Sequence, residues 1–338
     1  MIAAAAGYGG ARYARRRAAD IHWMEPGPKG MRYRKFGRTG LDVSETGFGS
    51  WGIGGSYGAT AQQDSLNALA RAEELGCNFV DSAAVYGDAE ATLGEYLQGR
   101  RERWIVATKY SGQDAGMTAT LESQLRNLRT EAVDLYQLHW VPKDEALYAE
   151  LARLKRTGKT RFIGVSLYTP ADIDFVLSRP EIDAFQVAFS LLDPDPFLSR
   201  VHAIHEAGKA VIVRSALREG FLTGKFKRDQ KFPDAADQRH ELTVEQIANI
   251  VDQVERFRFL EPEAGSMVVA AARYPLSFAD VSTVILGTKS ATQADSNFGQ
   301  VPGGTLSSPS LERVRDLQVE LELGSRWRRA LRRWRLAS

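Results

Sequence analysis

The sequence predicts an α/β protein of the (β/α)8 TIM-barrel class, with a β-hairpin before the barrel and an extra helix after the last strand. Short apolar runs alternate with longer amphipathic stretches, which is typical of βαβ units around a parallel sheet. There are eight such runs, the strand number of the barrel, and 338 residues are long enough for a barrel of ~250 residues. An open doubly wound sheet is the rival topology. The residues at the ends of the strands, described below, favour the barrel.

The predicted strands follow a hairpin at the start of the regular pattern. In this hairpin, MRYRKFG and LDVSETGFG flank the turn RTG. The TGFG at the end of the second segment is also the first predicted barrel strand. The other seven are apolar runs at 77–81, 104–109, 133–139, 161–166, 184–189, 210–215 and 281–287.

The predicted helices lie between these runs, with apolar residues three or four positions apart. Several end in a basic residue and Gly, as in LKRTGK and HEAGK, which is typical of helix C-termini. The gap from 216 to 280 is expected to hold a loop over 216–241 and then a helix. The predicted helical segments are 65–75, 119–128, 146–159, 201–209, 243–257 and, after the last strand, 310–321.

Charge is unevenly distributed along the chain and divides it into three parts. Residues 1–30 carry a net charge of +3, residues 326–338 carry six Arg and no acid, and residues 31–325 carry 33 basic and 40 acidic residues. We expect a disordered extension at 1–30, the barrel domain at 31–325 and a basic Arg/Trp tail at 326–338. A transit peptide, or a functional start at Met31, is the alternative for the first part. The tail forms a short basic amphipathic pattern, suited to packing on the acidic body or to docking on a membrane surface or partner.

Composition excludes several classes of protein. With 43% hydrophobic and 25% charged residues, the chain resembles an ordinary soluble globular protein. The single cysteine, Cys77, excludes a disulfide framework within the chain and lies in an apolar run, which predicts a buried, inert thiol. No stretch reaches the ~20 apolar residues of a membrane span, and the acidic body argues against nucleic acid as a partner. We therefore expect a cytoplasmic protein, without fixing its oligomeric state.

Ionisable residues stand at the ends of three successive predicted strands. CNFVD ends in Asp81, WIVATK in Lys109 and VDLYQLH in His139, at intervals of 28 and 30 residues. The C-terminal ends of barrel strands meet on the face where barrel active sites lie. Because buried Lys and Asp are rare unless paired, we expect an Asp81–Lys109 ion pair there. A purely structural ion pair is the alternative.

A tyrosine in the first of these strand-to-helix loops adds a possible proton donor. Tyr86 lies five residues after Asp81 in DSAAVYG. A tyrosine has a reference pKa of about 10, and a nearby ammonium group stabilises its phenolate. Next to Lys109, Tyr86 could therefore serve as the general acid for a carbonyl oxygen that becomes an alkoxide. A packed loop aromatic is the alternative.

With these residues in place, the chain closely resembles the aldo-keto reductase family from about Met31 to Asn297. The hairpin and first strand resemble that family's barrel plug and first loop, and DSAAVYG, ATKY and DLYQLHW resemble its catalytic segments. The resemblance implies NADPH-dependent reduction of an aldehyde or ketone. Tyr86 would be the proton donor, Lys109 and Asp81 would tune it, and His139 would orient the carbonyl.

The resemblance also implies a cofactor site for NADP(H). GVS at 164–166 resembles the carboxamide-binding segment, although Leu167 stands where Asn is common, and Arg214 stands where relatives often have an aromatic ring that stacks on the nicotinamide. Lys289, near the start of a helix with backbone N–H groups nearby, suits a phosphate and favours NADP over NAD; a solvated loop lysine is the alternative. The implied cofactor residues are Gly49, Ser50, Trp51, Asp81, Ser166, Gln186, Arg214, Ser215, Leu217, Gly220, Lys225, Gly287, Thr288, Lys289, Ser290, Gln293 and Asn297.

Two further patterns are interpreted as structural. GFGSWG has the spacing of a dinucleotide fingerprint but lacks the helix that this motif requires at its glycines. No cluster has metal-ligand spacing. The remaining histidines are expected in loops or helices without partners: His22, His202, His205 and His240.

The substrate pocket is expected to be aromatic, lined by Trp51, Tyr110 and Trp140, for a small-molecule carbonyl compound. Three other functions stay open at this point. One is oxidation of an aldose with NAD(P), and another is a Schiff-base aldolase that uses Lys109. The third is a non-catalytic, NADP-binding regulatory subunit.

Overall fold

Eight parallel strands close into a barrel in the computed structural model, which describes residues 30–55, 61–235 and 237–323. The strands pair in chain order, and the last one, β10, pairs with both β9 and β3 to complete the ring. The predicted barrel and N-terminal hairpin are therefore confirmed. The barrel strands are β3 (Thr46–Gly49), β4 (Phe79–Asp81), β5 (Ile105–Tyr110), β6 (Val133–Leu138), β7 (Thr160–Leu167), β8 (Ala184–Ala188), β9 (Ala210–Arg214) and β10 (Thr283–Gly287).

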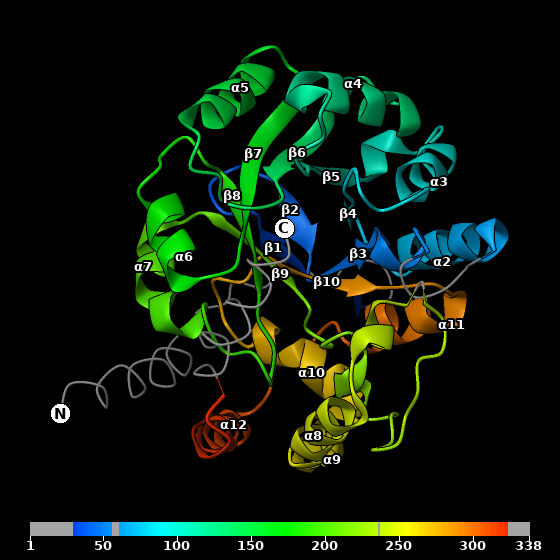
Figure 1. The fold of residues 1–338 in the computed structure, drawn as a ribbon, viewed down its shortest axis with the longest axis vertical. Helices are drawn as coiled ribbons and strands as arrows, with labels where there is room; N and C mark the ends of the chain where they lie inside the picture. Colours follow the sequence, from blue (N-terminus) through cyan, green and yellow to red (C-terminus); the bar gives the residue numbers. More distant parts are fainter. Residues whose placement is uncertain (1–29, 56–60, 236, 324–338) are drawn as a thin grey trace.

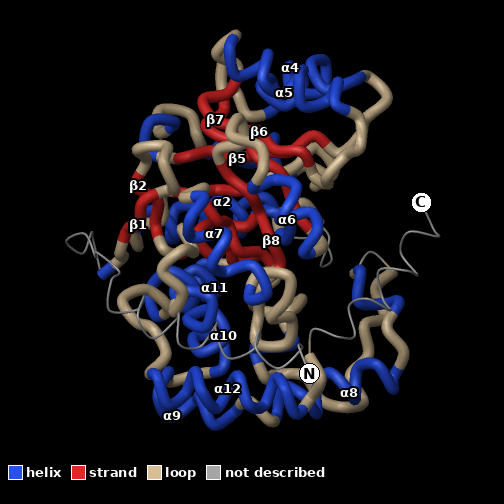
Figure 2. Tube along the Cα trace, turned by 90° about the vertical axis from the view of Figure 1, so that its left-hand side faces the viewer, coloured by secondary structure: helices blue, strands red, loops and turns tan. Residues whose placement is uncertain are grey.

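Helices surround the barrel, as Figure 1 shows in a view down the shortest axis of the molecule. In that view α2 to α7 run around the strands, and α8, α9, α10 and α12 form a group on one side; Figure 2 gives the same arrangement turned by 90°. The helices are α2 (Gln62–Glu74), α3 (Ala89–Tyr96), α4 (Gly116–Asn127), α5 (Glu145–Arg156), α6 (Pro170–Leu177), α7 (Val201–Ala207), α8 (Val244–Glu255), α9 (Glu261–Ala264), α10 (Met267–Leu276), α11 (Ala291–Ala294) and α12 (Ser308–Glu320).

The structure adds five helices that the periodicity did not predict. Two are the four-residue helices α9 and α11, and the other three are α3, α6 and α10. Helix α6 begins with Pro170, and a capping box between Thr169 and Asp172 starts it. Helix α10 has buried residues at almost every position, so its sequence shows no amphipathic period. The extension 1–29 and the basic tail 326–338 lie outside the described residues, and no described helix has the length and hydropathy needed to cross a bilayer.

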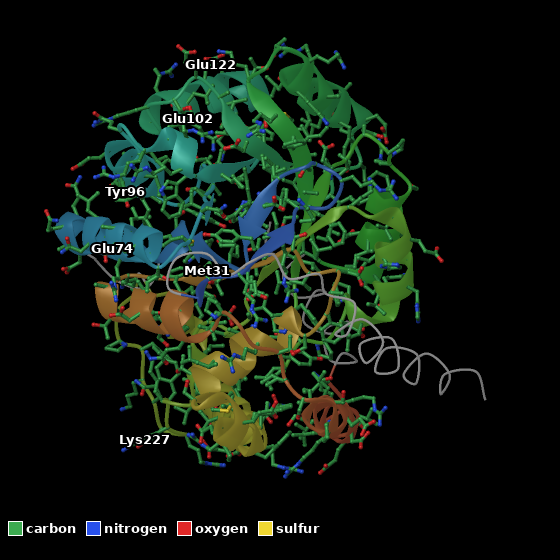
Figure 3. The ribbon with its side chains drawn as sticks, turned by 180° about the vertical axis from the view of Figure 1, so that it is seen from behind. Met31, Glu74, Tyr96, Glu102, Glu122 and Lys227 are labelled. Atoms are coloured by element: carbon green, nitrogen blue, oxygen red, sulfur yellow. The ribbon has the colours of Figure 1, made fainter. Side chains whose placement is uncertain are left out.

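The hairpin, formed by β1 (Tyr33–Lys35) and β2 (Asp42–Ser44), closes one end of the barrel. In Figure 3, which shows the molecule from behind, the hairpin lies over the ring of strands. Phe36 and Val43 are fully buried in one apolar cluster with inward-facing residues of β4, β5, β6, β8 and β9. Phe36 packs against Phe79, with ring centroids 5.7 Å apart. The hairpin thus fills the barrel end that lies opposite the strand C-termini.

We expect Gly37→Ala to destabilise the protein by about 2–3 kcal/mol, a strain of the size found for forced backbone conformations. Gly37 has φ +53°, and a Cβ there would lie 2.3 Å from the backbone nitrogen of Ala210. Gly40→Ala is the matched control, because Gly40 also has positive φ (+81°) but has no atom within 4 Å of its would-be Cβ. Urea unfolding of both variants measures the difference. Equal losses would show that the contact with β9 is unimportant.

Candidate active site

The predicted ionisable residues come together at the C-terminal edge of the barrel, at the inner end of a cavity of about 710 Å³. Asp81 is the last residue of β4, Lys109 is the second-last of β5, and His139 follows β6 directly. Tyr86 lies in the loop after β4. Asp81, Tyr86 and His139 line the cavity, whereas Lys109 lies behind them with no exposed surface. The strand order therefore makes neighbours of residues that are about thirty positions apart in the chain.

Lys109 and Asp81 form a buried ion pair, as the sequence predicted. Lys109 Nζ donates to Asp81 Oδ2, and also to the carbonyl of Ser82 at 2.8 Å. Burial lowers the pKa of the Lys109 ammonium group, and Asp81 opposes this shift. Asp81 Oδ1 accepts a hydrogen bond from the side-chain amide of Gln137 and another from that of Gln186, both at 3.0 Å. Three donors thus stabilise the Asp81 carboxylate, and Gln137 is one that sequence reasoning missed.

Tyr86 is enclosed by the other residues of the site. Its side chain is 7% exposed, and its ring packs edge-on against Trp51, with centroids 4.7 Å apart. The ring also meets His139 at 5.9 Å, and Lys109 Nζ lies 5.2 Å from its centroid. A cation this close to a tyrosine stabilises the phenolate form. The arrangement is therefore able to transfer a proton from Tyr86 to a bound oxygen.

His139 is a neutral imidazole near pH 7. Burial, with help from the positive charges of Lys109 and Arg214, lowers the pKa of His139 to about 3. Its Nδ1 lies 2.7 Å from the hydroxyl of Ser111, a neighbour that the sequence did not single out. When Ser111 donates to Nδ1, the proton of the ring resides on Nε2. In that tautomer the imidazole presents a hydrogen-bond donor without a charge.

This pKa makes His139 a source of acid sensitivity. Between about pH 6.5 and 3, the unfolded chain binds a proton at this histidine and the folded chain does not, so the free energy of unfolding falls as the pH falls. We expect His139→Gln to reduce this loss by up to about 1.4 kcal/mol per pH unit. Urea unfolding between about pH 7 and 5 measures the slope. Replacing the exposed His202 by Gln is the control, and equal slopes in both variants would contradict the assignment.

Most of the implied cofactor residues also lie on the cavity. The cavity extends from Tyr86 along the segment after β9 to the start of the segment after β10. Gly287 lines it with no atom within 4 Å of its would-be Cβ, so the backbone is open to a ligand there. The implied residues on its wall are Gly49, Ser50, Trp51, Asp81, Gln186, Arg214, Ser215, Leu217, Gly220, Lys225, Gly287, Lys289 and Gln293.

The other four implied cofactor residues are outside the wall. Asn297 donates to Thr288 Oγ1 at 2.9 Å and to the Gly287 carbonyl at 3.4 Å, so this pair shapes the loop after β10. Ser290 caps α11 by accepting from the backbone of Gln293, whose side chain accepts from the N–H of Lys289 at 2.7 Å. The backbone donor of Lys289 is therefore occupied by Gln293. This differs from the free N–H groups expected near that lysine.

Unpartnered buried groups indicate that the site is built for a polar ligand. Ser166 Oγ, Ser50 Oγ and Trp51 Nε1 are buried and have no hydrogen-bond partner among the described residues. Buried polar atoms usually have a partner, so a ligand that supplies one is favoured. Ser166 pairs with Gln186 across β7 and β8, next to the residues around Asp81. The donor set fits a nicotinamide cofactor.

The segment after β9 is strained where it borders the cavity. Ser215, Arg218 and Glu219 have φ values of 57°, 47° and 50°, in the left-handed region that L-residues rarely adopt. Arg239, from the far end of the predicted loop, donates to the Glu219 carbonyl at 3.0 Å and pairs with Asp237. Sequence reasoning missed these wall residues because loop contacts leave no periodic signal. The missed residues on the wall are Val85, Tyr168, Ala216, Arg218, Glu219, Thr223, Gln238, Arg239, Ile285 and Leu286.

Two groups of predicted residues have other surroundings. Tyr110 and Trp140 pack against each other, with ring centroids 6.0 Å apart, and neither lies on the cavity wall. Of the three residues expected to line an aromatic substrate pocket, Trp51 is therefore the one on the wall. The prediction that the remaining histidines lack partners is wrong for the three that the structure describes, His202, His205 and His240. His205 pairs with Asp280 at 2.8 Å, and His240 lies 2.8 Å from the Phe232 carbonyl. His22 lies outside the described residues.

Cys77 is buried and inert, as the sequence analysis expected. Burial raises the pKa of its thiol to about 12, so the thiol is unreactive near pH 7. In the part of the chain that the structure describes, no group of three or more His, Cys, Asp or Glu residues could hold a metal ion.

Comparison with known proteins agrees with the fold. A family model described as "Aldo/keto reductase family" matches residues 45–318. The chain is 25% identical to aldo-keto reductase YhdN of Bacillus subtilis, covering 86% of this chain and 94% of YhdN. It is 26% identical to aldo-keto reductase yakc [NADP(+)] of Schizosaccharomyces pombe, with 84% and 92% covered.

Solved structures are similar over the same length. Aldo-keto reductase AKR11C1 of Bacillus halodurans, in its holo form, superposes with a TM-score of 0.72 at 27% identity, covering 85% of this chain and 96% of that one. Glycerol dehydrogenase AKR11B4 of Gluconobacter oxydans superposes with a TM-score of 0.73 at 26% identity, covering 85% and 95%. The chain is thus a (β/α)8-barrel oxidoreductase. Within that class it belongs to the aldo/keto reductase family.

Proposed function

We propose that the protein reduces an aldehyde or ketone to the alcohol with NADPH. The observation that carries this proposal is the buried Lys109–Asp81 pair beneath the Tyr86 ring, next to a neutral His139, at the inner end of the cavity. When bound, NADPH would supply the hydride that adds to the carbonyl carbon. The protein's residues would supply the proton and hold the reactants. The cytoplasmic location stays a prediction from the sequence.

The protonation steps follow from the geometry of the site. Tyr86 would donate its phenolic proton to the carbonyl oxygen as negative charge develops there. The Lys109 ammonium would stabilise the phenolate that remains, and Asp81 would hold Lys109 in place. His139 would donate from Nε2 to the same oxygen, which fixes the orientation of the carbonyl group without adding a second cation. Trp51 would pack against the substrate.

Residues along the cavity would hold the cofactor. Ser166 and Gln186 would bind the carboxamide group, and Ser215, Leu217, Gly220 and Lys225 would surround the pyrophosphate. Gln293 and Lys289 would lie near the phosphorylated ribose. Support comes from the unpartnered Ser166 hydroxyl at one end of this path and the basic side chains at the other. The name of the S. pombe relative includes NADP(+), in agreement with this proposal.

The direct experiment is to measure loss of NADPH absorbance by the purified protein against a panel of aldehydes and ketones. We expect turnover of at least one carbonyl class, with NADPH preferred to NADH. Nucleotide binding without turnover of any compound would instead support the non-catalytic regulatory subunit.

Oxidation of an alcohol or aldose is the second candidate. Glycerol dehydrogenase of G. oxydans and L-galactose dehydrogenase of Arabidopsis thaliana, 28% identical to this chain, are named for that direction. The same Tyr86 would then act as a base in its phenolate form. Rates with NADP⁺ and polyols or aldoses, beside the reductive panel, distinguish the two. The Schiff-base hypothesis is disfavoured because Lys109 is paired, fully buried and absent from the cavity wall.

Preference for NADPH over NADH is expected to depend on Lys289. This lysine lies on the cavity wall, where a 2′-phosphate would gain a charged contact worth about a factor of ten in affinity. We expect Lys289→Ala to raise the Kd for NADPH about tenfold and to leave that for NADH unchanged. Titration with each nucleotide measures both values. Lys227→Ala is the control, because Lys227 is exposed and outside the cavity wall (Figure 3); equal losses for NADPH and NADH would contradict the role of Lys289.

A further inference from the structure

Arg214 places a guanidinium group in the wall at the reactive end of the cavity. It is the last residue of β9, opposite Ala188 of β8, and shares this end with Tyr86, His139 and Gln186. Its guanidinium carbon lies 4.6 Å from the centroid of the Tyr168 ring, and its Nη2 donates to the Leu167 carbonyl at 3.2 Å. Its Nε is buried without a hydrogen-bond partner. A bound ring that reacts beside Tyr86 would therefore have a cation in the wall of its pocket.

The charge of Arg214 is not neutralised by a carboxylate of the described chain. Three other cations at the cavity have acidic partners within salt-bridge distance: Lys109 has Asp81, Arg218 has Asp193 and Glu219, and Arg239 has Asp237. For Arg214, the described contacts are a carbonyl oxygen and an aromatic face. The field of this cation reaches the reacting groups, since it lowers the pKa of His139 and also that of Lys109.

A nicotinamide ring differs in charge between its two oxidation states. The reduced ring is neutral, whereas the oxidised ring carries one positive charge, because it has given up a hydride ion with two electrons. A fixed cation nearby repels the oxidised ring and leaves the reduced ring almost unaffected.

We propose that Arg214 makes the site bind NADPH more tightly than NADP⁺, so that it favours occupancy by the reduced cofactor and release of the oxidised one. This inference rests on the proposed function, because it assumes that a nicotinamide cofactor reacts beside Tyr86. It adds a residue that discriminates between the two oxidation states of the cofactor. In this role Arg214 does more than replace an aromatic ring, because the face of an aromatic ring attracts a cation, whereas a guanidinium group repels one.

The test is the ratio of the Kd for NADP⁺ to the Kd for NADPH, measured by calorimetric titration of the full chain in the absence of substrate. We expect Arg214→Gln, which keeps N–H donors but loses the charge, to lower this ratio about tenfold. That is the order of magnitude for two unit charges roughly 10 Å apart at an effective dielectric constant of about 20. Arg214→Lys keeps the charge and is expected to keep most of the ratio. Arg214→Met provides a second uncharged variant, so that the result does not depend on the folding of one protein.

Arg218→Gln is the matched control. Arg218 is also on the cavity wall, but it is paired with Asp193 and Glu219, so its loss is expected to change both Kd values by the same factor. An unchanged ratio in Arg214→Gln and Arg214→Met would overturn the proposal. A selective loss of activity toward carboxylate-bearing aldehydes, with an unchanged ratio, would also overturn it and would assign Arg214 to the substrate instead.

The outcome is independent of carbonyl turnover. If the ratio responds to the charge at position 214 but no carbonyl is reduced, the inference stands and the proposed reductase function fails. If carbonyls are reduced but the ratio of the two Kd values does not change with the charge at position 214, the inference fails and the proposed function stands.

Discussion

Replacing Tyr86 by Phe is expected to lower kcat for carbonyl reduction by about 10²–10⁴-fold, the contribution typical of one general acid. Phe keeps the ring that packs against Trp51 and His139, so the variant loses the phenolic proton and little else. Loss of NADPH absorbance measures the rate, and nucleotide titration should give the wild-type Kd. A rate within a few fold of wild type would show that another group donates the proton.

Tyr96→Phe is the matched control for this experiment. Tyr96 is buried as deeply as Tyr86, at 7% exposure, but it lies on α3, where its hydroxyl donates to Glu73 at 2.6 Å. Losing that hydroxyl removes a hydrogen bond far from the cavity wall. We therefore expect Tyr96→Phe to affect stability modestly, by about 1 kcal/mol, and kcat not at all.

Replacing Lys109 by Met is expected to have the largest effect on stability, with a loss of about 3–5 kcal/mol in the free energy of unfolding. The substitution leaves the Asp81 carboxylate buried at 1% exposure, with the amides of Gln137 and Gln186 as its remaining described partners. A buried charge without a counter-ion is strongly unfavourable. Urea unfolding at neutral pH measures the loss.

The double variant Lys109→Met, Asp81→Asn distinguishes two causes of the lost stability: the uncompensated charge of Asp81 and the missing packing of the Lys109 side chain. Asparagine removes the uncompensated charge, so we expect much of the stability to return while activity stays absent. A double variant as unstable as Lys109→Met alone would mean that the Lys109 side chain stabilises the barrel through packing, with the charge pair unimportant.

The barrel could be predicted because its strands are short, apolar and separated by regular helical stretches. Helix α10 lies in the core and has apolar residues on all sides, so its sequence shows no amphipathic period. For that reason the sequence analysis did not predict a helix at this place in the long gap before β10. Helix α6 did leave local signals, the Thr169–Asp172 capping box and Pro170 at its first position, but neither of them is periodic. Both errors therefore come from reading amphipathic period as the main sign of a helix.

The catalytic cluster could be predicted because parallel strands bring their ends to one edge. Asp81, Lys109 and His139 needed only the strand order to become neighbours. Gln137 was missed because it lies within an apolar run, where its contact with Asp81 depends on which face of β6 points into the barrel. Ser111 was missed because a serine just after a strand is common and usually meets solvent. Its contact with His139 is visible only in three dimensions.

The strained segment after β9 has a consequence for engineering the protein. Ser215, Arg218 and Glu219 each hold a backbone conformation that costs of order 1 kcal/mol or more in an L-residue. Glycine at Arg218 or Glu219 would relieve that cost and raise thermal stability. The same change would loosen the wall that faces the bound nucleotide. A library selected only for heat resistance is therefore expected to accumulate glycine in this segment and to lose cofactor affinity as it does so.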